Sequence, residues 1–336
     1  GWGLNPYTVT VHDIINNYST EATMTTFLVT GGAGFIGSNL CETLLADGHR
    51  VRVLDDLSSG KEENLKEAGG QIDFIKGDIR DMATVLKAVK GVDYVVHLAA
   101  LGSVPRSVED PASTHEVNAT GTLNVLRASK EAVVKRVVYA SSSSVYGDTP
   151  VLPKREDMLP TPQSPYAVSK LTGEHYCRVF NMVYGLETVA MRYFNVYGKR
   201  QDPASQYAAV IPKFITSLIV GIAPTIFGDG GQTRDFTFVE DCNQANYKAC
   251  LAKGCAGEVF NVGYGERIDL NGLYAMIKKS ALSSIEPVYA LPRVGDIRDS
   301  LADISKAKKM IPYAPRYDIN TGIAKTVQWY MKKYAR

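Results

Sequence analysis

A glycine-rich turn between an apolar strand and an amphipathic helix constrains the fold of this chain more than any other feature. The apolar run Phe27–Thr30 leads into Gly31-Gly-Ala-Gly-Phe-Ile-Gly37, after which Leu40 and Leu44 recur at helical spacing. In such a turn one glycine permits the tight bend and another lets the backbone approach a pyrophosphate, while the helix N-terminus offers amide donors. The pattern predicts a dinucleotide-binding strand, turn and helix.

Strand and helix patterns alternate along the first two-thirds of the chain. Further apolar runs predict strands over Val51–Asp55, Ile72–Ile75, Val92–Leu98, Arg136–Ala140 and Thr188–Tyr193. Helical stretches separate most of these strands, and this alternation is typical of a parallel sheet with helices on both faces. We expect an α/β fold, a Rossmann-type doubly wound parallel sheet with a smaller, interleaved α/β substrate lobe.

The alternation becomes irregular after residue 195, where three prolines interrupt it: Pro203, Pro212 and Pro224. Phe236–Ala252 and Glu258–Gly263 look again like a helix and a strand of the large domain. We therefore predict a cofactor-binding domain of residues 24–194 plus about 236–264, and a smaller substrate lobe of about 195–235 plus 265–336. Residues 1–23 form an irregular polar extension, either added ahead of a natural start at Met24 or a native arm.

The composition argues against several partner classes. Of the 336 residues 45% are hydrophobic and 21% charged, and the net charge of +2 does not call for nucleic acid or a membrane surface. No apolar run approaches the roughly 18 residues that a transmembrane helix needs. The five cysteines are scattered without metal-ligand spacing, which predicts reduced thiols, no metal and a cytoplasmic location.

Asp55 ends the second predicted strand, about 20 residues after the glycine turn, where a carboxylate can accept hydrogen bonds from both hydroxyls of an adenosine ribose. A 2′-phosphate would be repelled at that position. The pair of motifs therefore favours NAD over NADP as the cofactor.

A tyrosine and a lysine four residues apart supply the candidate chemistry. Pro165 suits the first turn of a helix, so Tyr166 and Lys170 are expected to share one helical face. A tyrosine acts as a base at pH 7 only if its pKa falls by roughly 3 units, about 4 kcal/mol, which a nearby ammonium and a nicotinium ring can supply. Ser142, just past a predicted strand, can hold the substrate oxygen or relay its proton.

With these motifs the chain resembles the extended short-chain dehydrogenases/reductases, and among them the UDP-sugar 4-epimerases of the UDP-N-acetylglucosamine type. The resemblance runs from Met24 to the C-terminus. The motifs that carry it are Thr30–Gly37, His97-Leu-Ala-Ala100, Asn118-Ala-Thr-Gly121, Ser141–Gly147, Ser164–Lys170, Arg192-Tyr-Phe-Asn195 and Arg234-Asp-Phe236.

The resemblance implies roles for particular residues. Tyr166 would be the base, Lys170 its electrostatic partner and a ribose ligand, and Ser142 the hydroxyl at the sugar 4-position. The other implied cofactor contacts are Gly31, Gly34, Phe35, Ile36, Asp55, Asp56, Ser59, Gly60, Asp78, Ile79, Leu98, Ala99, Ala100, Asn118 and Tyr193. The implied substrate contacts are Gly102, Ser103, Ser142, Ser143, Tyr166, Asn195, Ala209, Val210, Phe227, Arg234, Phe236, Arg293, Asp296 and Ser300. Phe236 departs from a tyrosine often seen in the family, which puts one hydroxyl contact in doubt.

The serine run narrows the reaction class. Dehydratases of this family carry Thr-Asp-Glu where this chain has Ser142-Ser-Ser144, and UDP-glucuronate decarboxylases carry a glutamate at Ser144. Neither carboxylate is present, so oxidation at C4 followed by reduction from the opposite face is expected. A NAD-sensing module without activity is the alternative of another class, but such proteins typically lose the tyrosine or the lysine.

Ser300 suggests the sugar. Epimerases restricted to UDP-glucose and UDP-galactose have a bulky tyrosine at this position, whereas serine leaves room for a 2-acetamido group. We therefore expect interconversion of UDP-GlcNAc and UDP-GalNAc, with plain hexoses or a uronate, which Arg298 or Lys213 could meet, as alternatives. The resemblance also implies a homodimer joined by a four-helix bundle from Glu116–Lys130 and Pro165–Tyr184.

Overall fold

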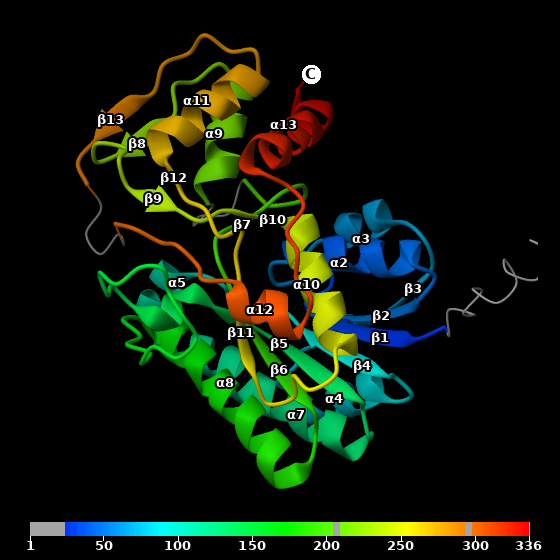
Figure 1. The fold of residues 1–336 in the computed structure, drawn as a ribbon. Coiled ribbons are helices and arrows are strands. Elements are labelled where there is room, and N and C mark those ends of the chain that lie inside the picture. The colour runs from blue at the N-terminus through cyan, green and yellow to red at the C-terminus, as the bar shows by residue number, and fades with distance from the viewer. Residues whose placement is uncertain (1–23, 204–208, 293–297, 336) are drawn as a thin grey trace, which may run out of the picture.

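A seven-stranded parallel sheet organises the larger part of the molecule (Figure 1). The computed structural model describes residues 24–203, 209–292 and 298–335. The strand order is β11-β6-β5-β4-β1-β2-β3, and every neighbouring pair is parallel. The strands are β1 (Thr26–Thr30), β2 (Arg50–Asp55), β3 (Ile72–Lys76), β4 (Tyr94–His97), β5 (Arg136–Ser142), β6 (Thr188–Tyr193) and β11 (Val259–Val262). The predicted doubly wound α/β fold is confirmed.

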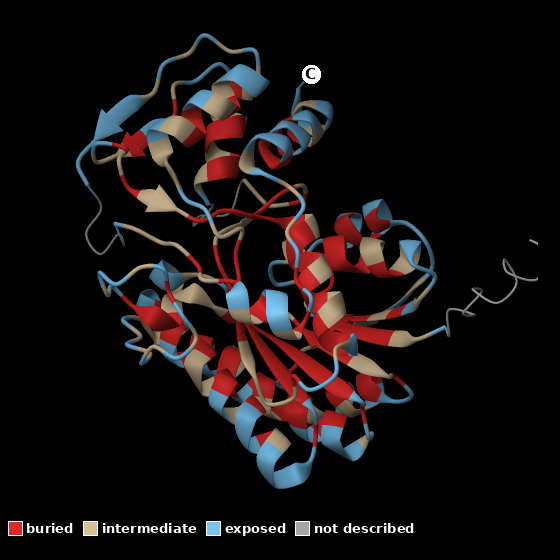
Figure 2. Cartoon of the chain, viewed as in Figure 1, coloured by how far each residue is buried: buried red, intermediate tan, exposed pale blue. Residues whose placement is uncertain are grey.

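Helices cover both faces of this sheet. One face carries α2 (Phe35–Ala46), α3 (Glu62–Ala68), α10 (Val239–Leu251) and α12 (Ser305–Met310), whose buried side chains form one apolar cluster with the sheet. The other face carries α4 (Met82–Val89), α7 (Gly121–Glu131) and α8 (Pro165–Tyr184), which form a second cluster. Alternate residues of β1 point to opposite faces, since Phe27 and Val29 join the first cluster and Leu28 the second. Figure 2 shows the buried strands between these two layers.

A third apolar cluster lies in the part of the molecule drawn above the sheet in Figure 1. Its helices are α9 (Val210–Ile219), α11 (Leu270–Ser280) and α13 (Ile319–Tyr334). Its short strand pairs are β7 (Val196–Tyr197) with β10 (Thr237–Phe238), β9 (Thr233–Arg234) with β12 (Ile268–Asp269), and β8 (Thr225–Phe227) with β13 (Val288–Ala290). The chain enters this part after β6 and returns to the sheet for β11. The exact domain boundaries stay a prediction, and residues 1–23 lie outside the described part.

Local sequence explains where the functional elements begin and end. Helix α8 starts after Ser164, whose hydroxyl accepts a hydrogen bond from the Ala167 N–H at 3.1 Å, and Pro165 fills its first position. It ends at Gly185, whose φ of 71° suits the left-handed turn that closes a helix. The remaining helical segments beside the site are α5 (Val104–Glu109), α6 (Pro111–His115), the π-helical turn η1 (Glu116–Thr120) and the 3₁₀ turn η2 (Ser143–Tyr146).

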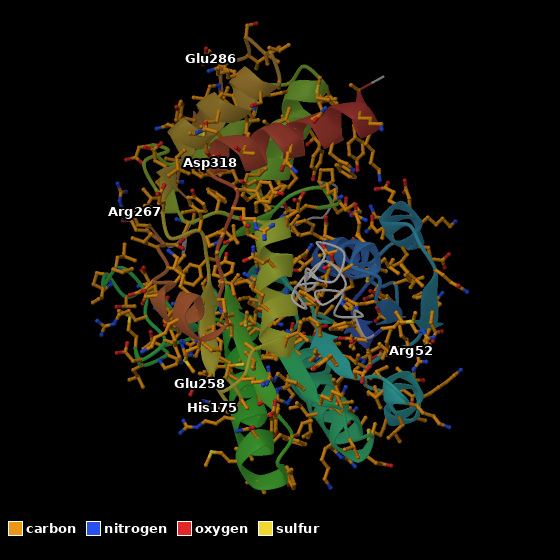
Figure 3. The ribbon with its side chains drawn as sticks, turned by 45° about the vertical axis from the view of Figure 1, so that its right-hand side comes forward. Arg52, His175, Glu258, Arg267, Glu286 and Asp318 are labelled. Carbon is orange, nitrogen blue, oxygen red and sulfur yellow. The ribbon has the colours of Figure 1, made fainter. Side chains whose placement is uncertain are left out.

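Charged side chains lie around both parts of the molecule, as Arg52 and Glu258 do beside the sheet and Glu286 does in the upper part (Figure 3). Within the described residues no helix combines the length and apolar character needed to cross a bilayer.

Candidate functional site

A cavity of about 950 Å³ opens at the carboxyl ends of the central strands. Most residues predicted to bind the cofactor line it, together with several predicted to bind the substrate. These are Gly31, Gly34, Phe35, Ile36, Asp55, Asp56, Ser59, Gly60, Asp78, Ile79, Leu98, Ala99, Ala100, Gly102, Ser103, Tyr166, Lys170, Tyr193 and Ala209. Ligands bind at this edge of doubly wound sheets because loops and helix N-termini converge there.

The glycine turn lets two backbones approach closely. Gly31 has a φ of +70°, and a Cβ atom on it would lie 2.7 Å from the Ala99 backbone nitrogen. A Cβ on Gly37 would lie 2.2 Å from the Gly31 carbonyl oxygen, so a side chain there would push helix and turn apart. Helix α2 begins after Gly34 with no side-chain cap. Its first amides are therefore available to an anion such as a pyrophosphate.

Backbone donors hold Asp55 at the end of β2. Its Oδ2 accepts from the Ala33 N–H at 2.9 Å and its Oδ1 from the Leu57 N–H at 2.8 Å. Burial raises the pKa of this carboxyl, while the two backbone hydrogen bonds act in the opposite direction. Each oxygen keeps a second lone pair, so the carboxylate can still accept from ribose hydroxyls. The glycine turn, the uncapped helix and this carboxylate fit a dinucleotide without a 2′-phosphate.

Asn118, which the resemblance places beneath the cofactor, has several protein hydrogen-bond partners in the structure. It lies buried in η1, and its side chain bonds the backbone of Leu101, with 2.8 Å from the Leu101 N–H to Oδ1 and 3.2 Å from Nδ2 to the Leu101 carbonyl. Nδ2 also lies 3.0 Å from the Ser169 hydroxyl of α8. Asn118 thereby fixes the loop after β4 against α8.

Tyr166 and Lys170 line this cavity, and Ser142 is a hydrogen-bond partner of Tyr166. The Lys170 ammonium lies 5.9 Å from the centre of the Tyr166 ring and donates to the Ala140 carbonyl at 2.8 Å. Burial lowers the pKa of Lys170 to about 8. Burial raises the pKa of Tyr166, and a hydrogen bond with the Ser142 hydroxyl partly lowers it. Ser142 is the last residue of β5, paired with Tyr193, so the predicted end of this strand at Ala140 was two residues short.

A buried ion pair behind these residues was not predicted. Glu174, one turn after Lys170, accepts from Arg192 Nε at 2.9 Å and from Arg192 Nη2 at 2.7 Å, and both side chains are 4% exposed. The Ser141 hydroxyl donates to the same carboxylate. His175, the next residue of α8, is exposed (Figure 3). The i, i+4, i+8 spacing of Tyr166, Lys170 and Glu174 puts all three on one helical face, and this spacing was the available signal.

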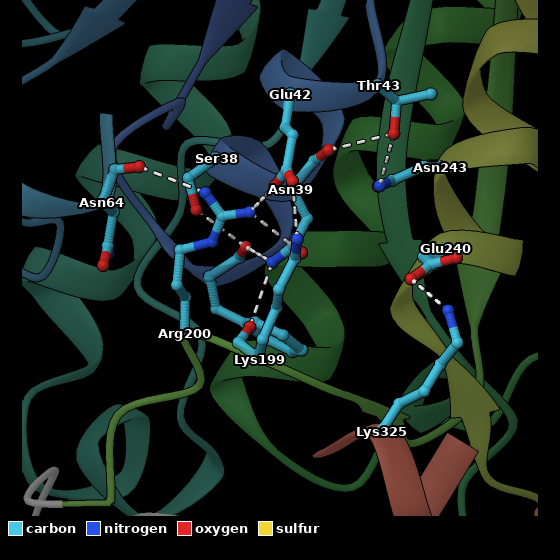
Figure 4. Close-up of polar contacts among 11 residues, drawn as sticks. Ser38, Asn39, Glu42, Thr43, Asn64, Lys199, Arg200, Glu240, Asn243 and Lys325 are labelled. Carbon is cyan, nitrogen blue, oxygen red and sulfur yellow. Dashed lines mark hydrogen bonds and ion pairs between the residues drawn. The ribbon is translucent and has the colours of Figure 1, made fainter. Parts of the chain in front are cut away.

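Arg200 is a second residue that sequence reasoning missed, and it also lines the cofactor cavity. Its guanidinium bonds the Asn64 carbonyl at 3.2 Å, the Asn39 side-chain oxygen at 3.3 Å and the Glu42 carboxylate (Figure 4). Lys199 reaches Glu42 as well, at 2.7 Å. The segment after β7 is thereby fixed to α2 and α3, beside the predicted dinucleotide site.

A smaller cavity of about 280 Å³ adjoins the first one, because Gln201 and Ala209 line both. Five predicted substrate residues besides Ala209 line it: Asn195, Val210, Phe227, Arg234 and Phe236. Ser300 lies next to Asn195, whose Nδ2 is 3.4 Å from the Ser300 hydroxyl. Ser142, Ser143 and Ser300 line neither cavity directly, and Arg293 and Asp296 lie outside the described residues.

A comparison with known protein families shows which family this chain belongs to. Residues 27–263 match the family described as NAD dependent epimerase/dehydratase. The chain belongs to this family. The predicted membership and the expected cofactor, NAD, are therefore confirmed, and the residues described above fit that cofactor.

Similar proteins include several kinds of UDP-sugar epimerase. The UDP-glucose 4-epimerase of Mycolicibacterium smegmatis is 43% identical over 310 residues, 91% of this chain and 98% of that protein. A solved UDP-N-acetylglucosamine 4-epimerase from Methanobrevibacter ruminantium, in complex with UDP-N-acetylmuramic acid, is 42% identical with a TM-score of 0.88 over 92% of this chain and 99% of its own. The UDP-glucose 4-epimerase of Thermotoga maritima, solved with UDP-glucose, is 38% identical with a TM-score of 0.87 over 92% and 99%.

Proposed function

We propose that the protein is a UDP-sugar 4-epimerase whose preferred substrates are UDP-N-acetylglucosamine and UDP-N-acetylgalactosamine. The two adjoining cavities support this proposal, because a dinucleotide in the larger one would meet a nucleotide sugar in the smaller one beside Tyr166. In this arrangement residues 24–194 with about 236–264 bind NAD, and most of the remaining chain binds the sugar nucleotide. When bound, NAD would supply the hydride acceptor for oxidation at C4 of the sugar and the hydride donor for the reduction that follows.

Tyr166 takes the proton of the sugar 4-hydroxyl, and Ser142 holds the oxygen. The protein's own surroundings raise the pKa of Tyr166 because burial outweighs the Ser142 hydrogen bond. Lys170 lies close enough to contribute attraction, since its ammonium is 5.9 Å from the ring centre. The positive charge of a bound, oxidised nicotinamide ring would supply further attraction for the phenolate of Tyr166.

Simple epimerisation, and not elimination or decarboxylation, is supported by the side chains around the base. Positions Ser142–Ser144 supply hydroxyls and no carboxylate. The carboxylate of Glu174, also on the face of Tyr166 and Lys170, is bonded to Arg192 and Ser141 and is buried. It is therefore not available as an acid or base for the substrate.

The preference for an N-acetylated sugar rests on the small side chain of Ser300 beside Asn195. A tyrosine in place of this serine would start from a position next to Asn195, which lines the smaller cavity. The test is to incubate the protein separately with UDP-GlcNAc and UDP-Glc and to identify the products by stereochemistry. Faster turnover of UDP-Glc would contradict the preference but not the 4-epimerase reaction.

Ser300→Tyr sharpens this test. Steric exclusion of the acetamido group should lower kcat/KM for UDP-GlcNAc by roughly 10-fold or more, while UDP-Glc turnover changes little. The control variant is Ser283→Tyr, which makes the same substitution in the loop after α11, away from the residues that line either cavity. Ser143→Tyr would not serve as a control, because Ser143 adjoins Ser142. Equal losses on both substrates would show that Ser300 does not select the sugar.

A uronate substrate is the second candidate. Lys213 lines the smaller cavity and could pair with a sugar carboxylate. Among similar proteins is the UDP-glucuronate 4-epimerase of Thermodesulfobacterium geofontis, 34% identical over 90% of this chain and 95% of its own. Turnover of UDP-glucuronate that exceeds that of UDP-GlcNAc, and that falls in Lys213→Met, would favour this candidate.

We also propose that the enzyme forms a homodimer through α8 and the η1–α7 helix. Helix α8 exposes Val168, Val179, Met182 and Val183 in the described chain. An apolar stripe of this kind on a surface helix is typical of a partner contact. A solution mass of one subunit would contradict the proposal, and Val179→Glu with Met182→Glu should convert a dimer to monomers.

A further inference from the structure

Asp235 is a buried carboxylate that the proposed reaction does not use. It lies between Arg234 and Phe236, which both line the smaller cavity, but its own side chain is 0% exposed. Its Oδ1 accepts from the Tyr264 N–H at 2.8 Å. Its Oδ2 accepts from the Gly265 N–H and the Ala302 N–H, both at 3.1 Å. A buried carboxylate is costly unless it is hydrogen-bonded, so these three bonds account for its presence in the interior.

The three donors come from two segments that are far from Asp235 in the sequence. Tyr264 and Gly265 follow β11, the edge strand of the large sheet. Ala302 lies two residues after Ser300, in the segment that runs beside the smaller cavity. Asp235 therefore joins the sheet edge, the strand with Arg234 and the segment with Ser300 at one point.

The backbone of Asp235 also reaches the sugar side of the site. Its carbonyl oxygen accepts from Asn195 Nδ2 at 2.9 Å, and the same nitrogen lies 3.4 Å from the Ser300 hydroxyl. The Ser300 N–H in turn donates to the Thr233 carbonyl at 3.1 Å. Asp235 is thus bonded through its main chain to Asn195 and through its side chain to the segment of Ser300.

We propose that Asp235 is a positioning residue that sets the separation of Asn195 and Ser300 and thereby the choice between N-acetylated and plain sugars. This inference rests on the proposed function, in which these two residues bound the sugar pocket. Asp235 does not touch the substrate, because its side chain is wholly buried. It acts by holding Ala302 at a fixed distance from the strand that ends in Arg234.

The chemistry of the carboxylate is specific to this task. Two oxygens accept three N–H groups, whereas an asparagine of the same shape has one oxygen and one NH₂ group. In Asp235→Asn an NH₂ group would face at least one backbone N–H, and one bond would be replaced by repulsion. The Ser300 segment would then move relative to Asn195 without any change in the residues that line the pocket.

Gly263 offers an independent perturbation of the same contact. A Cβ atom on Gly263 would lie 2.6 Å from the Ala302 Cβ and 2.8 Å from Asp235 Oδ2. Gly263→Ala should therefore separate Ala302 from Asp235 while all donors and the carboxylate remain. A matched control is Asp241→Asn, because Asp241 is also buried and accepts two backbone N–H groups, from Arg316 at 2.7 Å and Tyr317 at 3.1 Å.

The experiment uses the full-length wild type and the three variants. For each protein it measures kcat and KM for UDP-GlcNAc and for UDP-Glc, the amount of NAD bound, and the midpoint of thermal unfolding. We expect Asp235→Asn and Gly263→Ala to change the ratio of the two kcat/KM values at least fivefold, mainly through KM, with bound NAD unchanged. Asp241→Asn should lower the thermal midpoint and leave the ratio within twofold of the wild type.

Two results would overturn the inference. One is a ratio of the two kcat/KM values that is unchanged in Gly263→Ala. If Asp235→Asn does not fold, this result is sufficient by itself to refute the inference. The other is an equal change in Asp241→Asn, which would mean that any loss of stability alters the ratio. A wild type that prefers UDP-Glc would refute the proposed sugar, but the change in ratio would still test Asp235.

Discussion

Removal of the Glu174 carboxylate should destabilise the protein more than removal of any exposed acidic partner. Arg192 and Glu174 share two hydrogen bonds of 2.9 and 2.7 Å, and each side chain is 4% exposed. In Glu174→Ala the guanidinium would lose the carboxylate that its Nε and Nη2 contact and would keep the Tyr146 ring, 4.6 Å from its Cζ. Loss of one partner of a buried ion pair costs about 3–5 kcal/mol, because the remaining charge stays buried and unpaired.

A matched surface pair calibrates this expectation. Arg155 and Asp157 approach to 3.1 Å, but their side chains are 57% and 69% exposed. Exposed pairs contribute about 0–1 kcal/mol, so Asp157→Ala should cost less than 1 kcal/mol. Urea unfolding followed by circular dichroism measures both variants, and equal midpoints for Glu174→Ala and Asp157→Ala would refute the argument.

A double substitution distinguishes two causes of the lost stability, the unpaired buried charge and the lost side-chain packing. Glu174→Leu with Arg192→Met removes both charges and fills a similar volume, so it should recover most of the stability lost in Glu174→Ala. Activity should remain low in the double variant. Glu174 also accepts from Ser141, and Arg192 precedes Tyr193, so the pair fixes both strand ends that flank the base. Full activity in the double variant would mean that the pair serves stability alone.

Three further predictions concern the cofactor, the base and the pH dependence of stability. Gly31→Ala should release most bound NAD, measured by absorbance of the nucleotide after denaturation, because its Cβ would lie 2.7 Å from the Ala99 nitrogen. Tyr166→Phe should lower kcat at least ~100-fold with NAD content unchanged, and unchanged turnover would exclude Tyr166 as the base. Burial raises the pKa of Asp235 from 3.8 to about 6, so its stabilising contribution is present below pH 4 and is lost as the pH rises through 6. The unfolding free energy of the wild type relative to Asp235→Asn should therefore fall by about 3 kcal/mol from pH 4 to 7, and a constant difference would contradict the raised pKa.

The cofactor half of the site was predictable because its signals are local in sequence. A strand, a glycine turn and a helix follow each other between Thr26 and Ala46, and the carboxylate of Asp55 ends the next strand. Because β1 and β2 pair in parallel, the end of β2 with Asp55 lies beside the glycine turn that follows β1. The order of these elements in the sequence was therefore sufficient to predict the position of Asp55. The same reasoning brought Tyr166 and Lys170 to one face of α8, since Ser164 and Pro165 mark the first turn of this helix.

The supporting residues were not predictable, because their partners come from distant segments. Arg200 reaches Asn39, Glu42 and Asn64, which precede it by 136 residues or more. Nothing in the sequence near Arg200 distinguishes it from an exposed arginine. The bonds of Asn118 to the backbone of Leu101, 17 residues earlier in the chain, were likewise not predicted.

The buried polar residues Glu174 and Asp235 each join segments that are far apart in the sequence. Glu174 joins α8 to the ends of β5 and β6, and Asp235 joins the segment after β11 to that of Ser300. Tyr146 lies between them, with its ring over Arg192 and its hydroxyl donating to Asn261 of β11 at 2.6 Å. Asn261 Nδ2 in turn donates to the Asp303 carbonyl at 3.1 Å, three residues after Ser300. A continuous set of contacts therefore links α8, which carries Tyr166 and Lys170, to the segment that carries Ser300. If the proposed 4-keto sugar rotates between two hydride transfers, both sides of its pocket must keep a constant separation, and these contacts would maintain it.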